Sequence, residues 1–152
     1  MIPESSRYYG CVIDGVLDAV DSSISFRRLY SDVPGFFLVN ERIPLHVKYS
    51  SARTGPWAFN FHSSHRLLQR KSASDYGECV VALVCGRDGV AALQNSELEM
   101  VLETNVNSQE NVTVRRGHRK MFEIKGRNGV YDKKVARGSL QLLFSTLLIK
   151  AE

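Results

Sequence analysis

The segment IPLHVKYSSARTGPWAFNFH, residues 43–62, contains two stretches with the period of a β-strand. In residues 43–50, His46 and Lys48 fall on one face, because successive side chains of a strand point to opposite faces. In residues 55–62 the aromatic residues alternate with smaller or polar ones, which predicts that Trp57, Phe59 and Phe61 share a buried face. The first stretch is therefore either an ordinary strand or part of a catalytic centre, and the rest of the sequence bears on that choice.

The size and composition predict one globular domain without a membrane span. The chain has 152 residues, of which 43% are hydrophobic, and no apolar run approaches the roughly 20 residues that cross a bilayer. Residues 1–10 lack the pattern of a secretory signal. Cys11, Cys79 and Cys85 form no C-x-x-C pair, which argues against disulfides and zinc and favours a reducing, cytoplasmic location. We expect Cys79 and Cys85 to pack in or beside a buried strand.

The periodicity predicts helices and strands in alternation along the whole chain. Residues 7–23 and 64–76 have helical spacing, the second with Gly77 as a stop, and Ser96 with Glu99 forms a capping box for a helix over residues 97–104. A hairpin is expected from residues 35–40 and 43–50 across a two-residue connection. Further strands are expected at the segments 23–30, 55–62, 78–85, 90–94, 111–116 and 120–126, and a last helix at 139–152.

This order predicts an α/β (α+β) fold, a single domain over residues 1–152 with a mixed central sheet flanked by helices. Within it we distinguish a sheet-and-helix core (1–110), a basic hairpin (111–138) and a C-terminal helix (139–152). No strand is followed by G-x-G-x-x-G or G-x-x-x-x-G-K-[ST], which argues against nucleotide binding by those motifs.

Basic charge is concentrated in the predicted hairpin. Residues 111–138 hold nine Lys/Arg and two acidic residues, a net +7, whereas the whole chain carries +4 and the remainder therefore −3. A local basic patch predicts a partner with a phosphate backbone, DNA in preference to RNA. The alternative is a solvated face that only keeps the protein soluble. The predicted nucleic-acid-binding residues are Arg115, Arg116, Arg119, Lys120, Lys125, Arg127, Lys133 and Lys134.

The order of elements, with Asp32 fourteen residues before the H-V-K sequence at 46–48, resembles the PD-(D/E)XK, or restriction-endonuclease-like, nuclease family. The resemblance covers residues 5–103 and implies a metal-dependent endonuclease of the restriction or homing type that hydrolyses phosphodiester bonds. It implies catalytic roles for Asp32, His46 and Lys48, with Mg²⁺ or Mn²⁺ held by Asp32 and the backbone carbonyl of Val47. Cutting two strands would require a homodimer.

The sequence departs from that family at His46, where the second acidic residue is expected. Imidazole is a poor ligand for Mg²⁺. Three alternatives follow: a softer ion such as Mn²⁺, a carboxylate from Glu4 or Asp14, or a catalytically inactive domain of the same fold that binds nucleic acid or a protein. An interaction module of an unrelated α+β fold is a further alternative.

Two other motifs are weaker candidates. Glu123 and Lys125 form an E-x-K pair, whose simpler interpretation is an exposed ion pair on the basic hairpin. His62 and His65 stand one helical turn apart, but no third metal ligand lies near them in the sequence.

Overall fold

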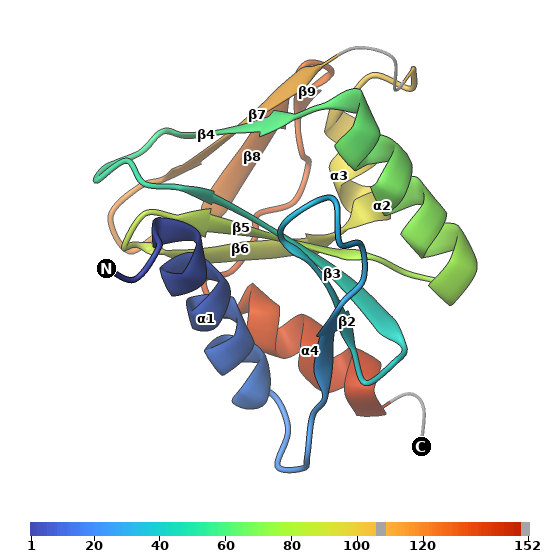
Figure 1. Ribbon diagram of the computed structural model, residues 1–152. Coiled ribbons are helices and arrows are strands. Elements are labelled where there is room, and N and C mark those ends of the chain that lie inside the picture. The colour runs from blue at the N-terminus through green and yellow to red at the C-terminus, as the bar shows by residue number, and fades with distance from the viewer. Residues whose placement is uncertain (106–108, 150–152) are drawn as a thin grey trace.

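The computed structural model describes residues 1–105 and 109–149 as one mixed α/β domain with two β-sheets (Figure 1). The predicted core segment 1–110 and the predicted C-terminal helix 139–152 thus include residues, 106–108 and 150–152, that lie outside the described part. The elements in chain order are α1 (Glu4–Leu17), β1 (Phe26–Arg28), β2 (Phe36–Val39), β3 (Ile43–Ser50), β4 (Trp57–Phe61), α2 (Ser63–Tyr76), β5 (Val80–Cys85), β6 (Gly89–Gln94), α3 (Asn95–Leu98), the 3₁₀ helix η1 (Glu99–Val101), β7 (Glu110–Arg116), β8 (Phe122–Gly126), β9 (Gly129–Val130) and α4 (Ser139–Ile149).

Sheet A has the strand order β1-β2-β3-β5-β6, and β3 and β5 are its parallel pair. The predicted hairpin is confirmed: β2 pairs antiparallel with β3, with Val39 opposite Ile43. The connection has three residues, one more than predicted, since Val39 pairs with Ile43, and Asn40 and Glu41 in it have left-handed φ of 53° and 55°. The parallel pairing of β5 with β3 places the sequence 43–50 in the middle of the sheet.

Sheet B has the order β4-β7-β8-β9 and is antiparallel throughout. The predicted mixed central sheet corresponds to sheet A, and sheet B is a second sheet that was not predicted from the sequence. The strand of the alternating aromatics, β4, pairs with β7, with Trp57 opposite Val114 and Phe61 opposite Glu110. Its three aromatic side chains are buried, and a second sheet packed on the first lets them cover apolar surface of both sheets.

Two cores lie on the two faces of sheet A (Figure 1). Helices α1 and α4 cover one face, where Val12 and Phe144 are fully buried. Sheet B and α3 cover the other, where Trp57 meets residues such as Leu83. All six residues of β5 are buried, as expected for a central strand, and both Cys79 and Cys85 are buried free thiols, as predicted.

The helix predictions are right in position and wrong in some boundaries. Helix α2 ends at Gly77, which has φ of 90°, as predicted. The capping box lies two residues earlier than predicted, because the backbone N–H of Gln94 donates to the Glu97 carboxylate (2.9 Å). The helix expected at 97–104 is consequently the short α3 followed by η1. Within the described ranges, no helix is both long and apolar enough to traverse a lipid bilayer.

Candidate functional site

Lys48 lies on the face of β3 that looks toward α2 and β4. Its Nζ donates a hydrogen bond to the backbone carbonyl of Asn60, and stands 3.3 Å from Nδ1 of His65 and 4.9 Å from the centre of the Phe61 ring. Burial lowers the pKa of Lys48 from 10.5 to about 8, because removing an ammonium group from water disfavours its charged form. Lys48 is thus a largely buried amine that joins three elements.

His46 lies beside Lys48 on the same face, as the strand period predicts, and it is 1% exposed. Its ring stacks on Phe36 with 3.8 Å between the centroids, and Gln69 Nε2 lies 2.8 Å from Nδ1. Because an amide NH₂ can only donate, Nδ1 is the acceptor and the proton of the neutral ring is on Nε2. Burial, followed by the charges of Lys48 and His65, lowers the pKa of His46 well below its usual value, and the residue links α2 to sheet A.

Helix α2 supplies two members of this cluster: His65, which was only a weak metal-ligand candidate in the sequence, and Gln69, which sequence reasoning missed. His65 and Gln69 are four residues apart, so they lie on one face of the helix. Burial and the nearby charge of Lys48 lower the pKa of His65 to about 4. Since an ammonium can only donate, Nδ1 of this neutral ring is the acceptor for Lys48. The sequence signal was the four-residue spacing of His65 and Gln69, which can be interpreted only once β3 is known to be the partner of this helix face.

A cavity of about 180 Å³ opens beside this cluster. The residues that line it are Tyr9, Pro34, His46, Val47, Lys48, Tyr49 and His65. They provide imidazoles, an amine and phenols, and they include no carboxylate. Among the described residues, no group of three or more His, Cys, Asp or Glu side chains could hold a metal ion.

The two predicted metal ligands, Asp32 and the Val47 carbonyl, have other contacts. Asp32 is exposed in the connection between β1 and β2, where its carboxylate accepts from the Ser31 hydroxyl (3.2 Å). The N–H of Val47 donates to Gly35 (2.8 Å), and its carbonyl oxygen lies 2.6 Å from the position that a Cβ on Gly35 would occupy. This carbonyl therefore faces the neighbouring backbone. A site for Mg²⁺, which requires several oxygen ligands, does not fit this donor set.

The predicted basic hairpin exists and forms the outer face of sheet B. Thr113 and Arg115 of β7 stand opposite Lys125 and Glu123 of β8, and they alternate with the buried Val112, Val114 and Ile124. The E-x-K pair is part of this surface: the Glu123 carboxylate accepts from Lys134 (2.6 Å), which lowers the pKa of Glu123. The ion pair of Glu123 is therefore with Lys134, and not with Lys125 of the E-x-K pair.

Two hollows on this surface share Arg115. One, of about 430 Å³, is lined by Gln109, Glu110, Asn111, Thr113, Arg115, Lys125, Gly126 and Arg127. The other, of about 510 Å³, is lined by Arg115, Gly117, Arg119, Lys120, Met121, Glu123 and Lys134. Glu110 is 3% exposed and its Oε1 accepts from the N–H of Glu103 (3.0 Å). The accessible charge of both hollows is therefore mainly positive.

Arg116 has a different role from its neighbours in the basic segment. Its guanidinium donates two hydrogen bonds to the Asp88 carboxylate (2.6 and 2.7 Å) and one to the carbonyl of Lys120 (3.1 Å). The arginine lowers the pKa of Asp88. With a side chain only 14% exposed, Arg116 joins the β5–β6 turn to the hairpin and is not available to a ligand.

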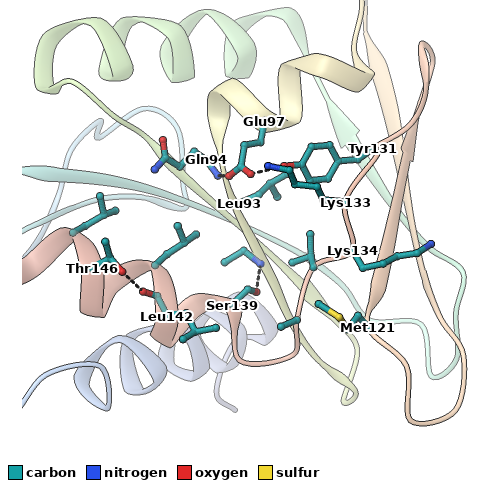
Figure 2. A pocket seen from close by; sticks show the side chains of 15 residues that line it. Leu93, Gln94, Glu97, Met121, Tyr131, Lys133, Lys134, Ser139, Leu142 and Thr146 are labelled. Carbon is teal, nitrogen blue, oxygen red and sulfur yellow. Dashed lines mark hydrogen bonds between the residues drawn. The ribbon is translucent and has the colours of Figure 1, made fainter.

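Lys133 and Lys134 line an apolar cavity of about 390 Å³ between α4 and residues 131–136. Figure 2 shows Leu142 and Thr146 of α4 on one side of this cavity and Tyr131 on the other. Glu97 accepts a hydrogen bond from the Tyr131 hydroxyl; burial, followed by that bond, raises the pKa of Tyr131 to about 12. These two lysines thus lie beside an apolar groove as well as near the hairpin.

Arg127 lies 3.7 Å from the Glu103 carboxylate and 4.0 Å from that of Glu110. His62 and His65 have ring centroids 5.2 Å apart.

No family model matches the chain, and neither the curated proteins nor the solved structures contain a significant match.

Proposed function

We propose that this protein binds nucleic acid, DNA in preference to RNA, through the outer face of sheet B and the loop between β7 and β8. The observation that carries the proposal is the pair of hollows that share Arg115. Their lining combines guanidinium and ammonium groups with the amides of Gln109 and Asn111. These groups donate hydrogen bonds to phosphate oxygens in protein–DNA contacts generally.

The cations of this surface differ in whether a carboxylate lies within ion-pair distance. Arg115, Arg119, Lys120 and Lys125 are exposed, and among the described residues none has an ion-pair partner within 4 Å. An unpaired, solvated cation can neutralise a phosphate and release the counterion that was condensed on it. A cation already held by a carboxylate gains less, since the carboxylate must first give it up. We therefore assign the main phosphate contacts to these four residues.

The proposed fold relationship is to the PD-(D/E)XK nucleases, in a form that binds without hydrolysis. Supporting it are a hairpin that ends in the H-x-K strand β3, a following helix α2, and a strand β5 parallel to β3. The Mg²⁺ or Mn²⁺ that such a nuclease uses does not fit the groups around Lys48, whose cavity has no carboxylate in its lining. His46 and Lys48 instead make the contacts to α2 and β4 described above.

The salt dependence of DNA binding tests this proposal. Four neutralised phosphates contribute about −3.6 to the slope of log K against log salt, at about −0.9 each on duplex DNA. The double variant Arg115→Gln/Lys125→Gln is expected to make the slope less negative by about 1.8 and to weaken binding to all sequences alike. The control Arg28→Gln/Lys71→Gln removes the same charge from exposed positions on β1 and α2, so it isolates position from net charge. Equal slopes for the two double variants would refute the assignment.

Incubation of plasmid DNA with the protein in Mg²⁺ and then in Mn²⁺ tests the binding-only part separately. We expect no cleavage in either ion. Cleavage that disappears in Lys48→Ala would replace the binding proposal with an endonuclease centred on β3.

A further inference from the structure

A second group of cations lies outside the basic hairpin. Arg7, Arg53 and Arg87 line a hollow of about 480 Å³, together with Glu4, Tyr8, Ser51 and Ala52. We call these three arginines the arginine triad. They come from α1, from the connection between β3 and β4 and from the β5–β6 turn, which Figure 1 shows at the same end of the molecule. Three distant parts of the chain therefore contribute one cation each to a single concave surface.

Contacts beneath the hollow hold these three segments in place. Tyr8 stacks on Tyr49 at the end of β3, with 4.5 Å between centroids and 12° between planes, which fixes the first turns of α1. The carbonyl of Ala52 accepts from the Trp57 indole (3.0 Å), which fixes the β3–β4 connection. The N–H of Gly86 donates to Ser50 (2.8 Å), which ties the β5–β6 turn to that connection.

The approach of the turn to the connection is close enough to require glycine. Gly86 has φ of +55°, and a Cβ there would stand 2.3 Å from the carbonyl oxygen of Ala52. Gly86 and Ala52 directly precede Arg87 and Arg53 in the chain. Their close approach therefore holds the backbones of these two arginines near each other. Preorganised backbones reduce the ordering that a ligand must impose when it binds.

The charge of the triad is not neutralised within the described part of the chain. No ion pair or side-chain hydrogen bond joins any of the three arginines to a described residue, and the single acidic side chain in the lining is Glu4. The lining thus carries a net +2 at neutral pH. Guanidinium groups bind phosphate oxygens in a bidentate manner, and the start of α1 contributes the partial positive charge of a helix N-terminus to the same side.

The triad is physically continuous with the hairpin. Arg87 is the neighbour of Asp88, and Asp88 is held by Arg116, which also donates to the hairpin loop at Lys120. We propose that the arginine triad holds a further phosphate group of the nucleic-acid backbone that crosses the hairpin. This inference rests on the proposed function, since the same ligand occupies both surfaces, and it assigns to Arg116 the role of fixing one surface relative to the other.

The test is the triple variant Arg7→Gln/Arg53→Gln/Arg87→Gln, compared with Arg27→Gln/Arg28→Gln/Lys71→Gln as the control of equal charge. On a duplex of about 20 base pairs the wild-type slope is expected to be about −4.5, from the four phosphates of the hairpin and the one held by the triad at about −0.9 each. The triad variant is expected to give about −3.6 and the control a slope like that of the wild type. Because the three arginines have no partner among the described residues, the variant should keep the wild-type circular dichroism spectrum and urea midpoint.

The outcomes separate this inference from the proposed function. A triad variant that binds duplex like the wild type, while Arg115→Gln/Lys125→Gln binds weakly, overturns the inference and leaves the hairpin assignment intact. Binding of inorganic phosphate is measured separately by NMR chemical shifts. A triad variant that loses only this binding overturns the inference as well, because the site then serves a free anion. If the triad variant weakens duplex binding and the hairpin variant does not, the triad assignment holds and the hairpin proposal fails.

Discussion

Replacing Lys48 by methionine is expected to stabilise the folded protein near neutral pH. Its pKa falls from 10.5 in water to about 8 in the fold, and each pH unit of that difference corresponds to about 1.4 kcal/mol. Holding the charged amine in the fold therefore costs about 3 kcal/mol at pH 7. The hydrogen bond to the carbonyl of Asn60 offsets about 1 kcal/mol, so Lys48→Met, which keeps the length of the side chain, should gain about 2 kcal/mol.

The lowered pKa of Lys48 determines how the free energy of unfolding changes with pH. The unfolded chain keeps the Lys48 proton up to pH 10.5, whereas the folded chain releases it near pH 8. Between these values the unfolded state binds more protons, and stability from this group rises with pH. The penalty is complete below pH 8 and is lost as the pH approaches 10.5. The advantage of Lys48→Met should therefore be largest at pH 7 and should shrink over that interval.

Urea unfolding of the wild type and of Lys48→Met at pH 7 and pH 10 measures this effect. The exposed Lys71 of α2, whose side chain is 62% accessible, provides the control Lys71→Met. We expect no comparable gain for that control at either pH. A Lys48→Met variant less stable than the wild type at pH 7, or one whose advantage is the same at both pH values, would refute the argument.

Four further substitutions test other parts of the fold. Gln69→Leu leaves Nδ1 of the buried His46 without a donor, and urea unfolding should show a loss of about 1–3 kcal/mol that the added change His46→Phe largely recovers. Arg116→Gln should lower the thermal midpoint at pH 7; because the arginine holds the pKa of the Asp88 carboxylate below its usual value, the difference should disappear as the pH falls through that lowered pKa. Gly10→Ala, with open space around the new methyl group, should stabilise α1 by about 0.5–1 kcal/mol. Gly126→Ala, whose Cβ would stand 2.2 Å from a backbone oxygen of η1, should destabilise by about 1–3 kcal/mol, and similar urea midpoints for the two alanine variants would contradict the packing argument.

Much of the local structure could be predicted because its causes are local. The alternation of residues 43–50 and 57–61 fixed which side chains share a face, and Gly77 marks the end of α2 through its own φ. The hairpin depends on a turn of three residues, of which Asn40 and Glu41 adopt positive φ. Each of these signals lies within one element or one turn, so no knowledge of the remaining chain was needed.

The division into two sheets could not be predicted because its cause is distant. Trp57 pairs with Val114, and nothing in residues 57–61 distinguishes that partner from a strand of sheet A. The capping box was misplaced for a related reason. Both Gln94 with Glu97 and Ser96 with Glu99 have the required spacing. The capping box is the first of these pairs because β6 ends at Gln94 and α3 begins at the next residue.

The cluster around Lys48 required the structure because half of it comes from another element. The face of α2 that carries His65 and Gln69 meets β3 only through the packing of the helix on sheet A. The sequence therefore gave a catalytic interpretation to His46 and Lys48 without showing that both have partners already. Their hydrogen bonds explain the pair without a metal ligand.

The count of basic residues in the sequence overstates the charge that a ligand can use. A cation that is solvated before binding gains more from a phosphate than one held by a carboxylate, because the carboxylate must first give the held cation up. Of the nine Lys/Arg in residues 111–138, Arg116, Arg127 and Lys134 lie within 4 Å of a carboxylate. Arg53 and Arg87 lie outside residues 111–138, and neither has a carboxylate of the described residues within 4 Å. Both are therefore available to a phosphate. The position of unpaired cations, and not the total in one segment, therefore determines where a phosphate backbone can bind.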